Sequence, residues 1–471
     1  MLRILNQYTT NLIYGITRSR WLVAAFLIGF ILFLLPSPEG LTVDGYRTII
    51  IIIVALILII TEPIPLPGIA LLIIILQVYF GIADANHVAH SFMNDAVFFI
   101  MGSLMLAVAI VQQGWDARIA LGIIRLTGNS TLKISIGFIV ISAVMSSFIG
   151  EHTVAAMMLP IGMTLIRYTS DDKTKVKNLA ALLLFSIAYG SLIGSIGTPS
   201  GGGRNAIMMV YWKEFGLAPI SYGKWMLMVY PLVLLQLPLL TWILWKSFVP
   251  EYLMLDSGIR KLKVQVARSG MIQPQQYFAV FLFFLVFLGW IFYSETVGLG
   301  IIALTGVVMY LVTGLAKWEE MSKHVNWGVV ILFGATISLG TMVNETGAAQ
   351  WIAGQVLNFA GEFVSSIPVF TDLIIVLMTT TLANILSSSA TVAVLAPITL
   401  NLPGDSIHIG LITAIASAFG YFTAVAAPAC TIIYASGMIK AKDFLKAGWK
   451  VGATSILMVL IYANIFWKLF G

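Results

Sequence analysis

The chain has 471 residues, of which 59% are hydrophobic and only 10% are charged, whereas an ordinary soluble domain has roughly 25% charged residues. This composition excludes a soluble enzyme. The formal net charge is +6, but the basic residues are scattered among loops instead of forming a patch, so no nucleic-acid partner is expected. The single cysteine, Cys430, excludes an intramolecular disulfide and a cysteine-based metal site.

Long apolar segments predict membrane-spanning helices, because about 20 apolar residues are needed to cross roughly 30 Å of hydrocarbon. The candidate spans lie near residues 21–36, 47–62, 67–83, 95–112, 132–149, 178–197, 224–246, 276–293, 297–314, 327–343, 368–386, 408–426 and 447–469. No small-residue cleavage site follows the first span, so we expect a retained helix rather than a signal peptide.

Two of the apolar segments are followed by a polar tip and then by a second, shorter apolar segment. The first tip, residues 150–153, reads Gly-Glu-His-Thr and precedes an apolar piece that ends at Pro160. The second tip, residues 387–389, reads Ser-Ser-Ser and precedes a piece that ends at Pro397. Each pattern predicts a helical hairpin that enters the membrane, turns at the tip and leaves on the same side.

The two halves of the chain follow one plan. After the first tip comes Gly197-Thr198-Pro199, and after the second comes Ala426-Ala427-Pro428, at a similar separation. We therefore expect an inverted repeat, with a first half at 1–246, a cytoplasmic linker at 247–275 and a second half at 276–471. Paired, interrupted segments at matching positions of two halves indicate the binding site of a secondary transporter.

An inverted repeat requires the two hairpins to enter from opposite sides of the bilayer. With the N-terminus in the cytoplasm, about eleven spans and two re-entrant hairpins, most of the 26 Lys and Arg residues fall on the cytoplasmic side. This agrees with the positive-inside rule. We expect an all-α polytopic protein, integral to a prokaryotic-type inner or plasma membrane and embedded in its lipid bilayer.

At its tips and breaks the chain resembles the divalent anion/sodium symporter family. The resemblance includes Ala155-Ala156-Met157-Met158-Leu159-Pro160 and Ile196-Gly197-Thr198-Pro199, and it covers nearly the whole chain. It implies a sodium-coupled symporter for a small divalent anion such as a dicarboxylate or sulfate, and a homodimer. Members of the family carry Ser-Asn-Thr at each tip; here the corresponding residues are 150–152 and 387–389, and Ala427 replaces a usual Thr.

The resemblance and the polar tips together indicate where an anion would bind. Unpaired N–H groups at helix N-termini, hydroxyl groups and a guanidinium can all replace the water around an anion. The candidate substrate-binding residues are His152, Thr153, Thr198, Arg204, Ser388 and Ser389. Two alternatives stay open: the serines could only bond backbone carbonyls within their helices, and His152 could be a core residue satisfied by a carbonyl.

The cation is expected at the same two tips. The candidate ion-binding residues are Gly150, Glu151, Gly197, Ser387, Ser388, Ala426 and Ala427, with Na+ at Glu151 and at Ser387. A carboxylate within the membrane usually has a function, and Glu151 allows three interpretations. It could ligate Na+ with a hard oxygen, carry H+ as the driving ion, or form a structural salt bridge with His152 or Arg204.

Other classes of protein fit the sequence less well. An intramembrane enzyme would use Glu151 and His152, but the His-Glu-x-x-His spacing is missing. No nucleotide-binding motif is present, so neither an organic cofactor nor a primary pump is expected. A proton-coupled transporter or an anion exchanger of the same fold remains an alternative, and a channel would not need duplicated hairpins.

Overall fold

The computed structural model describes residues 20–114, 118–119, 122, 126–170, 172, 174–217, 220–268, 273–360, 368–424 and 426–467. Every regular element in these ranges is helical, and one isolated β-bridge joins Ser130 to Met254. The all-α fold predicted from the sequence is confirmed.

In chain order the helices fall into two series, and the second series begins with α12. A first helix, Arg20–Leu34, precedes the labelled ones. The first series is α2 (Val43–Thr61), α3 (Leu66–Tyr79), α4 (Ala85–Phe92), α5 (Asp95–Gln112), α7 (Thr131–Ile149), α8 (Glu151–Thr169), α9 (Lys177–Gly194), the 3-10 helix η1 (Pro199–Gly201), α10 (Gly203–Glu214) and α11 (Tyr222–Ser247). The second begins with α12 (Asp256–Arg268), α13 (Pro274–Val297), α14 (Leu299–Val312), α15 (Trp318–His324), α16 (Trp327–Glu345) and α17 (Ala348–Ala360). It ends with α19 (Pro368–Ala383), α20 (Ser388–Thr399), α21 (Ser406–Ala416), α22 (Pro428–Ala435) and α23 (Ala441–Ile465).

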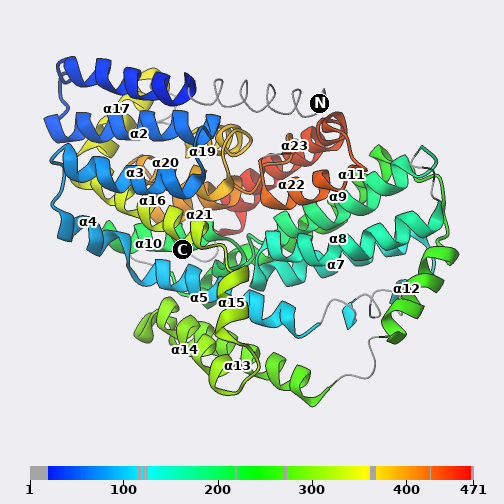
Figure 1. Cartoon of the computed structure of the whole chain (residues 1–471). Helices are drawn as coiled ribbons and strands as arrows, with labels where there is room; N and C mark the ends of the chain where they lie inside the picture. The colour runs from blue at the N-terminus through cyan, green and yellow to red at the C-terminus, as the bar shows by residue number, and fades with distance from the viewer. Residues whose placement is uncertain are drawn as a thin grey trace, which may run out of the picture.

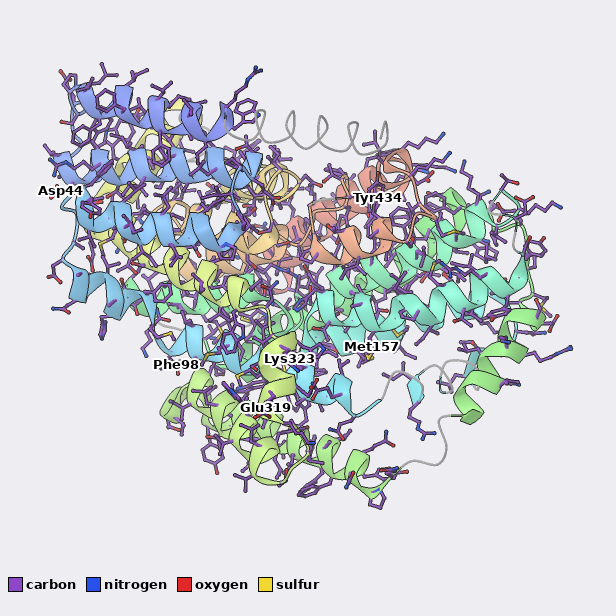
Figure 2. All side chains as sticks on the ribbon, viewed as in Figure 1. Asp44, Phe98, Met157, Glu319, Lys323 and Tyr434 are labelled. Carbon is purple, nitrogen blue, oxygen red and sulfur yellow. The ribbon has the colours of Figure 1, made fainter. Side chains whose placement is uncertain are left out.

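Eight helices of the described chain are long and apolar enough to cross a membrane, and six further apolar helices are shorter. Many large apolar side chains are exposed, among them Phe30, Leu34, Trp242 and Phe292. Figure 2 draws the side chains on the ribbon. Helix α13 has only 22% of its apolar window buried inside the protein, whereas α9 has 89%. The outer helices therefore present apolar surface that only lipid can cover, and the protein is integral to a membrane. The expected number of spans stays a prediction.

Helices of the two series pack against each other in a crossed pattern. Helix α5 contacts α14, and α16 contacts α3; likewise α8 contacts α22, and α10 contacts α20. In Figure 1, α7, α8 and α9 occupy the right half of the molecule, while α3, α16 and α20 occupy the left half. Helices of one series thus pack against helices of the other. This packing is expected if the two halves of the chain have the same order of helices. The boundaries proposed from the sequence are compatible with it and stay a prediction.

Two glycines allow α9 to lie directly on α7. A Cβ at Gly190 would lie 2.9 Å from the carbonyl oxygen of Ile139, and one at Gly194 would lie 2.5 Å from the carbonyl carbon of Ala143. Both obstacles are backbone atoms, which cannot turn away as a side chain can. Close backbone approach at small residues is typical of packed membrane helices. Here it places the end of α9 against the end of α7, next to the first tip.

Two details of the helices differ from the sequence prediction. We expected the apolar pieces after the tips to end at Pro160 and Pro397, but α8 continues to Thr169 and α20 to Thr399. Proline is tolerated within membrane helices because neighbouring groups bond the freed carbonyls.

The segment predicted as a linker, residues 247–275, contains helix α12. Helix α12 packs on α8, and a Cβ at Gly258 would lie 2.8 Å from the carbonyl oxygen of Leu165. This segment is therefore held against the helix that follows the first tip. The sequence predicted its basic character, but not this contact.

Candidate functional site

Gly150 makes the turn between α7 and α8. Its φ of 83° lies in the region that favours glycine, because a side chain would clash with the backbone there. Glu151 is the first residue of α8, and His152 and Thr153 follow in the same turn. Glu151 is buried, whereas His152 and Thr153 are half-buried. The tip therefore presents one buried carboxylate and two more accessible polar side chains at a helix N-terminus.

A buried ion pair joins this tip to α10. The Glu151 Oε2 atom accepts a hydrogen bond of 3.0 Å from Arg204 Nη1 and one of 2.9 Å from the hydroxyl of Ser195. The two charged side chains are 8% and 1% exposed. Arg204 Nη2 also donates to Ser195 Oγ. The salt bridge that the sequence left open as an alternative is confirmed, and the carboxylate and guanidinium neutralise one another.

The break between α9 and α10 is held by side chains on both sides of it. Thr198 caps η1 by accepting a hydrogen bond of 3.1 Å from the Gly201 N–H, and its hydroxyl donates to the Ser147 carbonyl at the first tip. The Asn205 amide donates to the carbonyls of Ser195 and Thr198, at 2.8 and 2.7 Å. Tip and break therefore form one hydrogen-bonded unit. Asn205 was not predicted as a site residue.

The second tip differs from the first because it carries hydroxyl groups and no charge. Ser387 caps α20, its hydroxyl accepting a hydrogen bond of 3.3 Å from the Ala390 N–H. The hydroxyl groups of Ser388 and Thr391 are buried without a hydrogen-bond partner among the described residues. Buried polar atoms are almost always satisfied, so such hydroxyls indicate a place where a ligand or water binds. Ser389 lies next to them and is half-buried.

Asn384 ties the second tip to the break between α21 and α22. Its amide donates to the Phe419 carbonyl at 3.0 Å, and its side-chain oxygen accepts a hydrogen bond of 2.9 Å from the Phe422 N–H. The Thr423 hydroxyl donates to the Asn384 carbonyl at 3.3 Å. Sequence reasoning missed this residue. The available signal was a lone amide in an apolar segment, just before the three serines.

Replacing Asn384 with alanine is expected to reduce anion uptake at least tenfold and to destabilise the protein by about 1–3 kcal/mol, because the partly buried Phe419 carbonyl and Phe422 N–H lose their partner. Thermal unfolding and uptake in vesicles measure the two effects. Asn401 is the matched control, since its amide bonds only the Pro397 carbonyl within the same hairpin. Wild-type uptake by the Asn384→Ala protein would show that the tip is positioned by other contacts.

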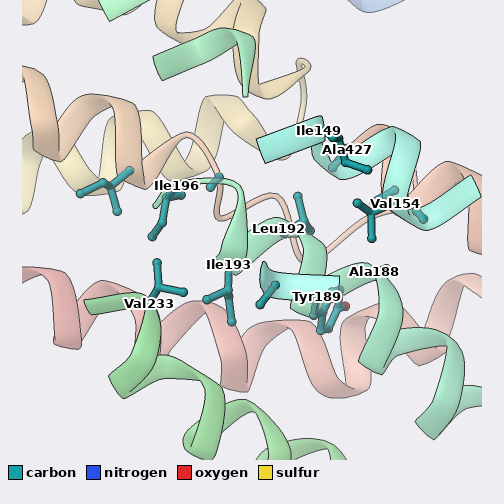
Figure 3. Close-up of a cluster of buried hydrophobic side chains, with 14 of the residues drawn as sticks. Ile149, Val154, Ala188, Tyr189, Leu192, Ile193, Ile196, Val233 and Ala427 are labelled. Atoms are coloured by element: carbon teal, nitrogen blue, oxygen red, sulfur yellow. The ribbon is translucent and has the colours of Figure 1, made fainter. Parts of the chain in front are cut away.

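The second break offers only backbone groups at the predicted ion-binding positions. Ala427 precedes α22 without a side-chain cap, whereas Thr198 caps the corresponding turn in the first half. Figure 3 shows Ala427 beside Ile149 and Val154, which lie on either side of the first tip. This agrees with the contact between α8 and α22. Ala426 and Gly197 likewise have no polar side-chain atom to offer.

The predicted site residues thus form two clusters. The residues of the first tip and the first break, Gly150, Glu151, Gly197, Thr198 and Arg204, lie on elements joined by the bonds described above. Ser387, Ser388 and Ser389 lie at the start of α20, which packs against α10, the helix that carries Arg204. Among the described residues, no hydrogen bond links Ser388 directly to Glu151 or Arg204. The α10–α20 contact includes the hydrogen bond of 3.0 Å from the Tyr211 hydroxyl to the Ala393 carbonyl.

Comparison with known proteins identifies the relatives of the chain. Residues 17–471 match the family described as "Sodium:sulfate symporter transmembrane region". The sodium-dependent dicarboxylate transporter SdcS of Staphylococcus saprophyticus is 27% identical over 481 residues, covering 96% of this chain and 92% of that protein. The protein of the same name from Staphylococcus aureus is 28% identical over 465 residues, covering 92% and 89%.

Two solved structures share the fold. Neisseria gonorrhoeae MtrF, described among antimetabolite efflux pumps, has a TM-score of 0.56 and 14% identity, covering 96% of this chain and 94% of that one. The Alcanivorax borkumensis YdaH transporter has a TM-score of 0.54 and 10% identity, covering 97% and 98%. At these identities the likeness concerns the fold alone. The family match, which extends over nearly the whole length, confirms the resemblance seen at the tips: the chain belongs to the sodium:sulfate symporter family.

Proposed function

We propose that the protein is a secondary active transporter that moves a small divalent anion, such as a dicarboxylate or sulfate, together with Na+. The observation that carries this proposal is the pair of hairpin tips, each bonded to a broken helix. Four helix N-termini, those of α8, η1, α20 and α22, lie at these tips and breaks. Such N-termini attract anions through their unpaired N–H groups. Relatives named sodium-dependent dicarboxylate transporters support the same proposal.

We assign the anion to donors at both tips. His152 and Thr153 are half-buried at the first tip, and Ser388 and Ser389 begin α20. Arg204 keeps one donor for substrate, because its Nε is buried without a partner among the described residues. Thr198, whose hydroxyl bonds the tip backbone, acts by positioning it. An anion shared between the clusters would join the two halves of the protein.

We place the coupling Na+ at the second tip, with Ser387 and Ser388 and the backbone of Ala426 and Ala427. Na+ prefers hard oxygen ligands, and the buried Ser388 hydroxyl has no other partner among the described residues. At the first tip, Gly150, Gly197 and Glu151 are the corresponding candidates. Proton coupling through Glu151 is the alternative, since protonation removes the cost of burying its charge.

Uptake into proteoliposomes tests the proposal. An inward Na+ gradient is expected to drive accumulation of a radiolabelled dicarboxylate or sulfate, with K+ or choline as the matched control. The transported anion is also expected to raise the melting temperature, because a ligand at 100 times its Kd stabilises the folded state by about 2.7 kcal/mol. Uptake driven by a pH gradient alone, and lost in Glu151→Gln, would instead support proton coupling. Strict counter-flow without a cation requirement would support exchange, and uptake that does not saturate would support a channel.

The orientation in the membrane is part of the proposal. We infer a cytoplasmic N-terminus and linker in a bacterial-type plasma membrane, and a homodimer. Single cysteines in a Cys430→Ala background are expected to be labelled from the cytoplasm near Lys175 and Arg260, and from outside near Leu402. A further position, Ala218, lies outside the described residues. Labelling of position 260 from outside would overturn the topology, and a monomeric mass by light scattering would overturn the dimer.

A further inference from the structure

The two tips differ in how far the protein already satisfies its own oxygen atoms. We propose that the Arg204 guanidinium occupies the cation position of the first tip, so that transport couples to one Na+ fewer than if that position were open. This inference rests on the proposed sodium coupling. The Arg204 guanidinium would then replace a bound cation at the Glu151 carboxylate.

The first argument is charge. The Glu151 carboxylate is the acidic group at the first tip, and Arg204 lies on it at 3.0 Å with a side chain that is 1% exposed. A Na+ bound to the same carboxylate would lie close to the guanidinium, away from water that could screen their repulsion. One positive charge therefore satisfies this carboxylate, and the chain supplies that charge itself.

The second argument is the use of the surrounding carbonyl oxygens. The Ser195 and Thr198 carbonyls accept from the Asn205 amide, and the Ser147 carbonyl accepts from the Thr198 hydroxyl. The Ser195 hydroxyl bonds both members of the ion pair. A cation needs such oxygens as ligands. At the first break each of these carbonyl oxygens already accepts one hydrogen bond from the protein, and Asn205 Oδ1 is the buried oxygen there that has no partner among the described residues.

The second tip provides the contrast. Four buried hydroxyls on the two helices of its hairpin have no partner among the described residues; they belong to Thr379, Thr380, Ser388 and Thr391. Hydroxyl oxygens without a bond can ligate Na+. No charged side chain of the described protein pairs with them. The second tip has four such hydroxyls and no guanidinium beside them, so we assign the coupling ion to it.

The test removes the guanidinium and asks whether Na+ takes its place. In Arg204→Gln the Glu151 carboxylate keeps its position without a cation, and Na+ is expected to fill the gap. Melting temperature is measured against NaCl at constant ionic strength, with choline as the replacement. We expect Na+ to raise the melting temperature of Arg204→Gln by several degrees more than that of the wild type. Equal Na+ responses in the two proteins would overturn the proposal.

Two control variants show whether the Na+ response comes from loss of the Arg204 charge. Arg47→Gln removes a different ion pair, the exposed one with Asp44 at 3.4 Å, and is expected to respond to Na+ as the wild type does. Arg204→Lys retains a cation and should not gain a Na+ response.

Should Arg204→Gln fail to fold, the neutral double variant Glu151→Gln/Arg204→Gln decides the matter. If Na+ raises the melting temperature of this variant as much as that of the wild type, the proposal is supported; a smaller rise contradicts it, because Glu151 would then be a Na+ ligand. A wild type without any Na+-driven uptake would overturn the proposed function, while the melting experiment on Arg204→Gln would still test the guanidinium's role.

Discussion

Replacing Gly194 with valine is expected to destabilise the protein by about 3 kcal/mol and to abolish transport, because overpacking at this point cannot be relieved by a side-chain rotation. The added Cβ would lie 2.5 Å from the carbonyl carbon of Ala143, in the backbone of α7. The Gly194 carbonyl also accepts a hydrogen bond of 2.8 Å from the Ser147 hydroxyl at the first tip. Forcing α9 away from α7 would therefore displace the tip as well.

Thermal unfolding and Na+-driven uptake measure the two parts of this prediction. Gly354 is the matched control: it is also helical, in α17, and a Cβ there would meet no atom within 4 Å. Gly354→Val should therefore melt close to the wild type. If the two valine variants melted at the same temperature, the close contact between α7 and α9 would not be a determinant of stability.

The architecture was predictable because apolar length carries most of the information in a membrane protein. The segments predicted at 47–62 and 95–112 correspond to α2 and α5 within a few residues. The short helices α4 and α15 were not predicted. They follow Asp84 and Lys317 and lack the long apolar run that marks a span. Helix α4 is capped locally, because the Asp84 carboxylate accepts from the Asn86 and His87 N–H groups.

The candidate site was predictable where charge and position pointed to one partner. A carboxylate and a guanidinium at these two places leave few other ways to avoid an unpaired charge in the membrane, so Glu151–Arg204 could be named in advance as an alternative. Asn205 and Asn384 could not be predicted as site residues. Each acts on backbone groups at a break in a helix, and the position of such a break relative to a hairpin tip is a property of the folded chain. The sequence position of a single amide side chain does not indicate which backbone groups it will bond.

Breaking the buried ion pair from one side is expected to cost about 3–5 kcal/mol, because the remaining charge stays buried without a partner. We expect Arg204→Met to show this loss in sodium-free choline buffer, and Glu151→Gln to show a comparable one. The double variant should recover much of the stability, since neither charge then needs a partner. Urea unfolding at pH 7, followed by tryptophan fluorescence, gives the three free energies of unfolding and, from them, the coupling energy of the cycle.

The cycle separates two roles that the pair could have. If the pair only holds tip and break together, Arg204→Met should lose the same stability relative to the wild type in sodium and choline buffers, and the coupling energy should not depend on the cation. If the guanidinium stands where a cation belongs, Na+ should stabilise Arg204→Met more than it stabilises the wild type and thereby reduce the apparent coupling energy. The Glu151→Gln variant serves as the internal control, because it retains the buried guanidinium and offers Na+ no carboxylate. It should gain no more stability from Na+ than the wild type does, so an additional Na+ effect confined to Arg204→Met would come from the vacated carboxylate.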